Sequence, residues 1–141
     1  LEDYLPAFAA TEENTPFISY YDVDKQDKGG LTAFDMCRGS VWRAAKGFGR
    51  IMKEGLGLKE GDCVTHYFTG NRLEDVVLRL TSVMIGTTPV TINWQADTIE
   101  RAIYKIKTTT TRVVCVDHNT PQTFLSELEK EMGKEVWVVR P

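Results

Sequence analysis

The sequence lacks several features that would assign it to a membrane or secreted class. Its longest apolar run is well short of the roughly 20 residues that cross a bilayer, so we expect no transmembrane helix. It starts at Leu1 rather than Met, and Glu2 and Asp3 stand where a signal peptide would be basic. We therefore expect an intracellular, cytoplasmic protein, of which this sequence is an excised piece.

Basic charge and cysteine are also scarce. Seventeen Lys and Arg residues against twenty Asp and Glu residues give a formal net charge of −3. The basic residues are scattered rather than clustered, so nucleic acid is not an expected partner. The cysteines, Cys37, Cys63 and Cys115, are odd in number and lie in apolar stretches. This pattern indicates packed thiols in a reducing compartment rather than a disulfide framework.

The residues that are present are enough for one compact domain, since 42% of the 141 residues are hydrophobic. We divide the chain into a lead-in segment over residues 1–16 and an α/β subdomain over residues 17–141. Residues 17–23 favour a strand, either at a sheet edge or in a hairpin. Thr32 and Asp35 form a Thr-x-x-Asp capping box, which predicts a long amphipathic helix from there to Gly55.

Strands and helices then alternate along the chain. Strands are predicted over residues 63–69, 89–92, 112–116 and 135–139. Helix starts are predicted at Asn71 with Glu74, at Asp97 with Glu100, and at Thr120 with Pro121. No hairpin turns separate these strands, so we expect a three-layer α/β domain with a mainly parallel sheet flanked by helices.

Two further expectations follow from this architecture. The first of these three helices should cover the sheet through Val76, Val77 and Leu80. Ligands of parallel sheets collect beyond the carboxyl ends of the strands. In this sequence those ends are marked by Thr69, Gly70, Asn71, Asn93, Asp117 and His118.

None of the chemical motifs in the sequence assigns a site. The glycine pairs around Phe48 and Leu56 lack the third glycine of a dinucleotide-binding loop, and Gly86-Thr87-Thr88 lacks a following lysine. Two Cys-x-x-His pairs suggest zinc, but residues three apart on a strand point to opposite faces. Packed cysteines with one core and one loop histidine are the simpler interpretation. We assign no catalytic, cofactor-binding or metal-binding residue.

A set of stretches resembles, in order and spacing, the N-terminal part of adenylate-forming enzymes: acyl- and aryl-CoA ligases, luciferases and peptide-synthetase adenylation domains. Residues 31–35 resemble the family pattern Leu-Thr-Tyr-x-Glu-Leu, and residues 57–64 are similar to Gly-Val-x-x-Gly-Asp-x-Val. Gly70-Asn71 resembles the Pro-Asn-Ser helix start. Residues 84–93 resemble Lys-Ala-Gly-Ala-x-x-x-Pro-Ile-Asn, with Thr91 in place of a proline. Residues 99–106 and 111–117 read like the helix and strand that follow.

This resemblance implies a parent enzyme that uses ATP and magnesium to convert a carboxylic acid to an acyl-adenylate, then passes the acyl group to coenzyme A. The family's ATP loop, Thr-Glu motif, ribose-binding Asp and C-terminal Lys all lie downstream of this sequence. The implied role is therefore a non-catalytic scaffold segment whose partner is the remainder of the parent ligase.

Two alternatives remain open. One is a freestanding flavodoxin-like or receiver-like binding domain, although Asp117 is the one acid at a strand end. The other is an interaction module built on the ligase fold.

Overall fold

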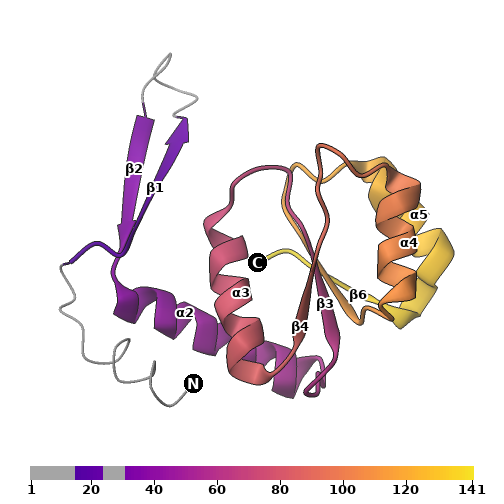
Figure 1. The fold of residues 1–141 in the computed structure, drawn as a ribbon, viewed down its shortest axis with the longest axis horizontal. Coiled ribbons are helices and arrows are strands. Elements are labelled where there is room, and N and C mark those ends of the chain that lie inside the picture. Colours follow the sequence, from indigo (N-terminus) through magenta and orange to yellow (C-terminus); the bar gives the residue numbers. More distant parts are fainter. Residues whose placement is uncertain (1–14, 24–30) are drawn as a thin grey trace. The chain divides into compact units, whose positions relative to one another are not determined.

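The computed structural model describes residues 15–23 and 31–141. The predicted lead-in over residues 1–16 therefore lies almost wholly outside the described residues and stays a prediction. The chain divides into two compact units, Leu1–Gly47 and Phe48–Pro141 (Figure 1). No helix among the described residues is both long and apolar enough to cross a membrane.

The first unit contains a β-hairpin. Strand β1 (Ile18–Val23) pairs antiparallel with β2 (Leu31–Met36), from Ile18 opposite Met36 to Val23 opposite Leu31. The hairpin interpretation of residues 17–23 is thus confirmed.

The prediction that a helix starts at Thr32 is wrong, because residues 31–36 form β2 and helix α2 spans Arg38–Arg50. The Ser19 hydroxyl donates to the Asp35 carboxylate across the hairpin at 2.6 Å, so Asp35 acts between strands rather than in a capping box. Cys37 lies at the true helix start, where its sulfur and carbonyl accept hydrogen bonds from the Ser40 amide at 3.4 and 3.1 Å. After α2 a π-helical turn, η1 (Ile51–Gly55), ends at the predicted Gly55.

The second unit is built on a parallel sheet of four strands: β3 (Cys63–Tyr67), β4 (Thr88–Thr91), β5 (Val113–Val116) and β6 (Trp137–Val139). Their order in the sheet is β4-β3-β5-β6, and all three pairings are parallel. The two central strands are almost completely buried, as expected for parallel strands covered on both faces.

Helices cover both faces of this sheet, which confirms the three-layer α/β prediction. Helices α4 (Ile99–Thr108) and α5 (Gln122–Met132) lie side by side on one face. They pack Ile103, Ile106 and Phe124 against Tyr67 and Val114. On the other face, helix α3 (Leu73–Ile85) contributes Leu78 to a second cluster with Met52, Val64 and Phe68.

The buried face of α3 differs from the predicted one. Val77 is buried as predicted, but Val76 is 45% exposed and Leu80 is half-buried. Leu78 and Thr81 are buried instead. Thr81 can be buried because its hydroxyl donates to the Val77 carbonyl at 2.9 Å. The helix also passes so close to Gly49 that a Cβ there would lie 3.0 Å from Ile85, which favours small side chains at this contact.

The helix caps also differ in detail from the predicted ones. Arg72, without a side-chain cap, precedes α3, and Thr98 rather than Asp97 caps α4 by accepting from the Arg101 amide at 3.3 Å. Asp97 instead accepts from the Asn93 amide at 2.8 Å and forms an ion pair with Lys105 at 2.5 Å. Gly86 ends α3 with φ of +76°, a left-handed conformation that glycine adopts at little cost.

Candidate functional site at the carboxyl ends of the strands

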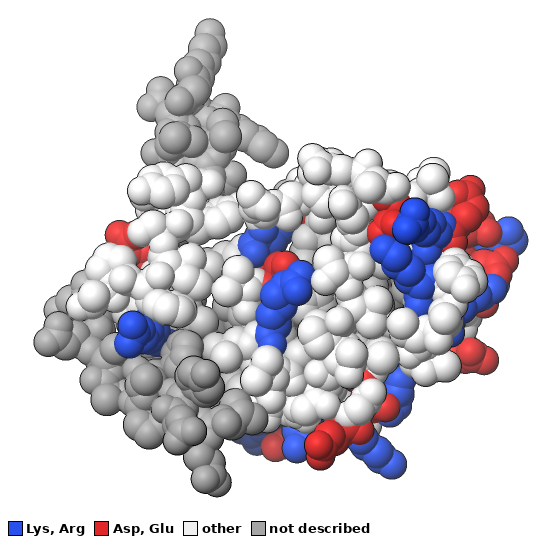
Figure 2. All heavy atoms as spheres, viewed as in Figure 1, with Lys and Arg blue, Asp and Glu red and all other residues white. Residues whose placement is uncertain are grey.

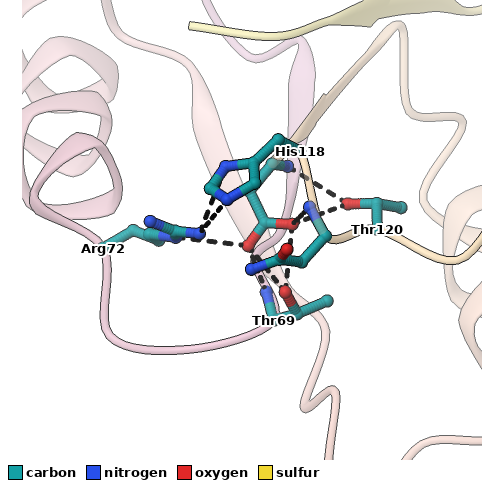
Figure 3. Close-up of polar contacts among 6 residues, drawn as sticks. Thr69, Arg72, His118 and Thr120 are labelled. Carbon is teal, nitrogen blue, oxygen red and sulfur yellow. Dashed lines mark hydrogen bonds and ion pairs between the residues drawn. The ribbon is translucent and has the colours of Figure 1, made fainter. Parts of the chain in front are cut away.

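Polar side chains converge where β3 and β5 end, and we call them the strand-end cluster: Thr69, Arg72, Asp117, His118 and Thr120 (Figure 3). Thr69 follows β3, and Arg72 immediately precedes α3. Asp117 and His118 come directly after β5, and Thr120 lies two residues before the start of α5. Because β3 and β5 are parallel neighbours, their carboxyl ends bring these two loops together.

Asp117 is the centre of the cluster, and its buried carboxylate is surrounded by donors. The backbone amide of Thr69 donates to it at 2.7 Å and the Thr69 hydroxyl at 2.8 Å. From its own loop it accepts the Asn119 amide at 3.0 Å and the Thr120 hydroxyl at 3.1 Å. The Thr120 oxygen in turn accepts the Asp117 amide at 3.1 Å. These bonds fasten the β3–α3 loop to the β5–α5 loop.

The hydrogen bonds also control the ionisation of Asp117. Burial by itself would raise the pKa of this carboxyl group. The bonds from Thr69 and Thr120 and the charge of Arg72 outweigh that effect and hold the pKa below its usual value. Asp117 is therefore charged near neutral pH and acts there as a hydrogen-bond acceptor.

Arg72 and His118 line the open side of the cluster. Arg72 Nε lies 3.4 Å from Asp117, and its Nη2 lies 3.3 Å from Nδ1 of the exposed His118 ring. They border a cavity of about 110 Å³ that is also lined by Phe68, Glu74 and Arg140. Pockets for cofactors and other drug-sized ligands usually enclose about 300–1,000 Å³. The cavity accommodates a few waters and is too small for a nucleotide.

The structure brings together three of the six residues predicted at the strand ends: Thr69, Asp117 and His118. Asn93 lies in the turn after β4, outside the cluster, where its side-chain oxygen accepts a hydrogen bond from the Gln95 amide at 3.1 Å. Gly70 and Asn71 connect Thr69 to Arg72 in the β3–α3 loop. The sequence analysis did not include Arg72, and it assigned Thr120 to a helix start. The Asp-x-x-Thr spacing after β5 could have linked Thr120 to Asp117, whereas no local pattern marks Arg72.

A second polar group lies within the sheet, where His66 is 1% exposed. Its Nδ1 lies 2.8 Å from the Asp75 carboxylate, which also accepts Arg79 Nε at 3.0 Å. His66 Nε2 is buried without a hydrogen-bond partner. The two Cys-x-x-His pairs thus place one histidine in the core and one in an exposed loop. Burial raises the pKa of the Cys115 thiol to about 12, which makes it a packing residue and not a nucleophile.

Metal-binding side chains do not converge in the part of the chain that the structure describes, where no three His, Cys, Asp or Glu residues could hold an ion. Charged residues are interspersed rather than segregated. Over the described residues on the face drawn in Figure 2, basic side chains stand next to acidic ones. Elsewhere among the described residues, ion pairs join Arg101 to Asp97 and Lys107 to Glu131.

Comparison with known proteins identifies the architecture. No protein-family model matches the sequence, and no curated protein matches it. Solved structures do match. An o-succinylbenzoate CoA synthetase from Bacillus subtilis, in complex with its acyl-adenylate intermediate, is 12% identical with a TM-score of 0.61, over 75% of this chain and 25% of that one.

Two further ligases give similar values. An anthranilate CoA ligase in complex with anthranoyl-AMP is 22% identical with a TM-score of 0.65, over 75% of this chain and 20% of that one. A Mycobacterium tuberculosis fatty acyl CoA synthetase is 15% identical with a TM-score of 0.67, over 77% of this chain and 21% of that one. The chain therefore spans a quarter to a fifth of these enzymes, and within that length it has the fold of an acyl- and aryl-CoA ligase segment.

Proposed function

We propose that the chain is a scaffold segment of an ATP-dependent acid–CoA ligase and is not catalytic by itself. The parent would be a cytoplasmic enzyme that joins a carboxylic acid to AMP and then transfers the acyl group to coenzyme A. The observation that carries this proposal is the shared fold, which covers about three quarters of this chain but at most a quarter of each ligase named above.

The chemistry of the described residues supports a scaffold role. The buried carboxylate of Asp117 is occupied by hydrogen bonds that join two loops. The cavity beside it is too small for ATP, and no three His, Cys, Asp or Glu side chains of the described residues are grouped so that they could hold a metal ion. We propose that ATP, magnesium and coenzyme A bind to other segments of the parent, and we derive no catalytic step from this chain.

The freestanding flavodoxin-like binding domain is the alternative from another functional class. It would use the same carboxyl edge of the sheet, where such domains bind ligands. No feature of the strand-end cluster favours it, because Asp117 and Thr69 are bonded to each other and the cavity of about 110 Å³ is narrow.

Acid-dependent exchange of pyrophosphate into ATP tests the proposal. We expect exchange with at least one member of a panel of aliphatic and aromatic acids from a purified longer polypeptide that contains residues 1–141. We expect none from the 141-residue chain alone, or from the longer polypeptide after deletion of these residues. Exchange by the 141-residue chain would contradict the scaffold role, and a longer polypeptide inactive with every acid would contradict the ligase assignment.

A further inference from the structure

Strand β6 is apolar but incompletely covered. Trp137 is 55% exposed and Val138 is 47% exposed, although they pair with Val113 and Val114, which are fully buried. Successive residues of a strand point to opposite faces of the sheet. Apolar surface is therefore left open on both faces of the sheet at β6.

The sequence of β6 is that of an interior strand. A continuous apolar run is typical of parallel strands that are covered on both faces. The buried strand β5 is such a run (Val113–Val116), and so is β6 (Trp137–Val139). The composition of β6 thus matches its buried neighbour, whereas its exposure is that of an edge strand.

The outer backbone of β6 is available for pairing. Within the described residues β6 pairs with β5 alone, and the Trp137 amide donates to the Arg112 carbonyl at 2.9 Å. Because the peptide groups of a strand alternate in direction, the amide and carbonyl of Val138 point away from β5. A row of such groups is a template for another strand.

The opposite edge of the sheet is constructed differently. Strand β4 contains Pro89, which has no amide hydrogen to donate, and the exposed Thr88 and Thr91. Proline and polar side chains are the usual means by which natural edge strands avoid further pairing. The sheet therefore has one edge adapted to solvent, at β4, and one that is not, at β6.

We propose that β6 is an interior strand of a larger sheet, and that a further β-strand of the longer ligase polypeptide pairs with its outer edge and covers Trp137 and Val138. This inference rests on the proposed function. The chain spans only a quarter to a fifth of similar solved ligases, so most of such a polypeptide is available to supply the strand. An isolated peptide strand could pair with the free backbone groups of β6. It would not cover the apolar side chains on both faces of the sheet, which need further layers of the fold packed against them.

Hydrogen–deuterium exchange tests this pairing directly. The peptide covering residues 136–140 should exchange at least about tenfold more slowly in the longer polypeptide than in the 141-residue chain, because paired interior amides open rarely. Equal exchange in the two proteins would overturn the proposal. Protection that appears in the 141-residue chain as its concentration rises would assign the edge to a second copy, and would also overturn it. The measurement is independent of catalysis, so protection without pyrophosphate exchange would refute only the ligase function.

A proline substitution supplies the matched comparison. Val138→Pro removes an amide that points away from β5, so it should leave the thermal midpoint of the 141-residue chain nearly unchanged. In the longer polypeptide it should lower the thermal midpoint, because β6 loses the amide that donates a hydrogen bond to the added strand. Equal shifts in both proteins would contradict the proposal. If the variant fails to fold, the exchange measurement on the unsubstituted proteins still decides.

Discussion

Asp117 is the residue on which the strand-end cluster depends. Its carboxylate accepts hydrogen bonds from two loops that are 48 residues apart in the sequence, so it acts as a tie between them. Asp97 has a similar role in the turn between β4 and α4, where it accepts the Asn93 amide and pairs with Lys105. Acidic residues that follow these strands thus stabilise loop geometry.

Replacing Asp117 by Asn should destabilise the chain in a pH-dependent way. Hydrogen bonds to a charged group contribute about 1.5–3 kcal/mol, and we expect a loss of roughly 2 kcal/mol in the free energy of unfolding at pH 7. The folded pKa of Asp117 lies below the unfolded value of about 3.9. Its contribution is therefore fully present above about pH 4 and is lost as the pH falls through the folded pKa.

Urea unfolding of the wild-type and Asp117→Asn chains at pH 7 and pH 2.5 measures this difference. The difference in the free energy of unfolding between the two proteins should be smaller at pH 2.5 than at pH 7. Glu129→Gln, on the exposed side of α5, is the control and should have little effect at either pH. A gap of the same size at both pH values would mean that the charge of Asp117 does not contribute to stability.

Among the elements, those with strong local patterns were predictable from sequence and those set by distant contacts were not. The apolar runs of β3 and β5 are local patterns that determine strands. The glycine after α3 is a local pattern that determines the end of a helix. The capping box at Thr32 is an equally local pattern, but pairing with β1 overrides it. Arg72 joins the strand-end cluster only through the fold, because the partner it approaches, Asp117, is supplied by another strand.

Helix α3 provides a test at the scale of a single element. Leu78 is 1% exposed and belongs to the cluster with Val64 and Phe68, whereas Val76 on the same helix is 45% exposed. Truncating a buried leucine to alanine costs about 2–5 kcal/mol, whereas a surface change usually stays within about 0.5 kcal/mol. Leu78→Ala should therefore lower the urea midpoint sharply and Val76→Ala should barely move it. Similar midpoints for the two variants would mean that α3 packs through a different face.

At the scale of the whole molecule, both hydrophobic clusters lie in the second unit, whereas the described part of the first unit buries Cys37, Val41 and Ala45. The two core clusters and the apolar residues packed against them run from Phe48 to Val139. All four strands of the parallel sheet and the helices on its faces lie in the same span. A domain with its own core can fold alone, so the sheet and its helices should not require the hairpin for cooperative folding.

A truncated chain of residues 38–141, which removes the hairpin but keeps α2 whole, tests this independence. We expect a single cooperative unfolding transition with a free energy within about 1 kcal/mol of the full chain, because no member of either cluster is removed. The dependence of that free energy on urea should fall only slightly, since its slope follows the surface exposed on unfolding and, of the deleted residues that the structure describes, Cys37 is the one buried hydrophobic side chain. Circular dichroism and tryptophan fluorescence should report the same midpoint. A broad transition, or different midpoints from the two probes, would show that residues before Arg38 complete the fold and that the sheet is not an independent unit.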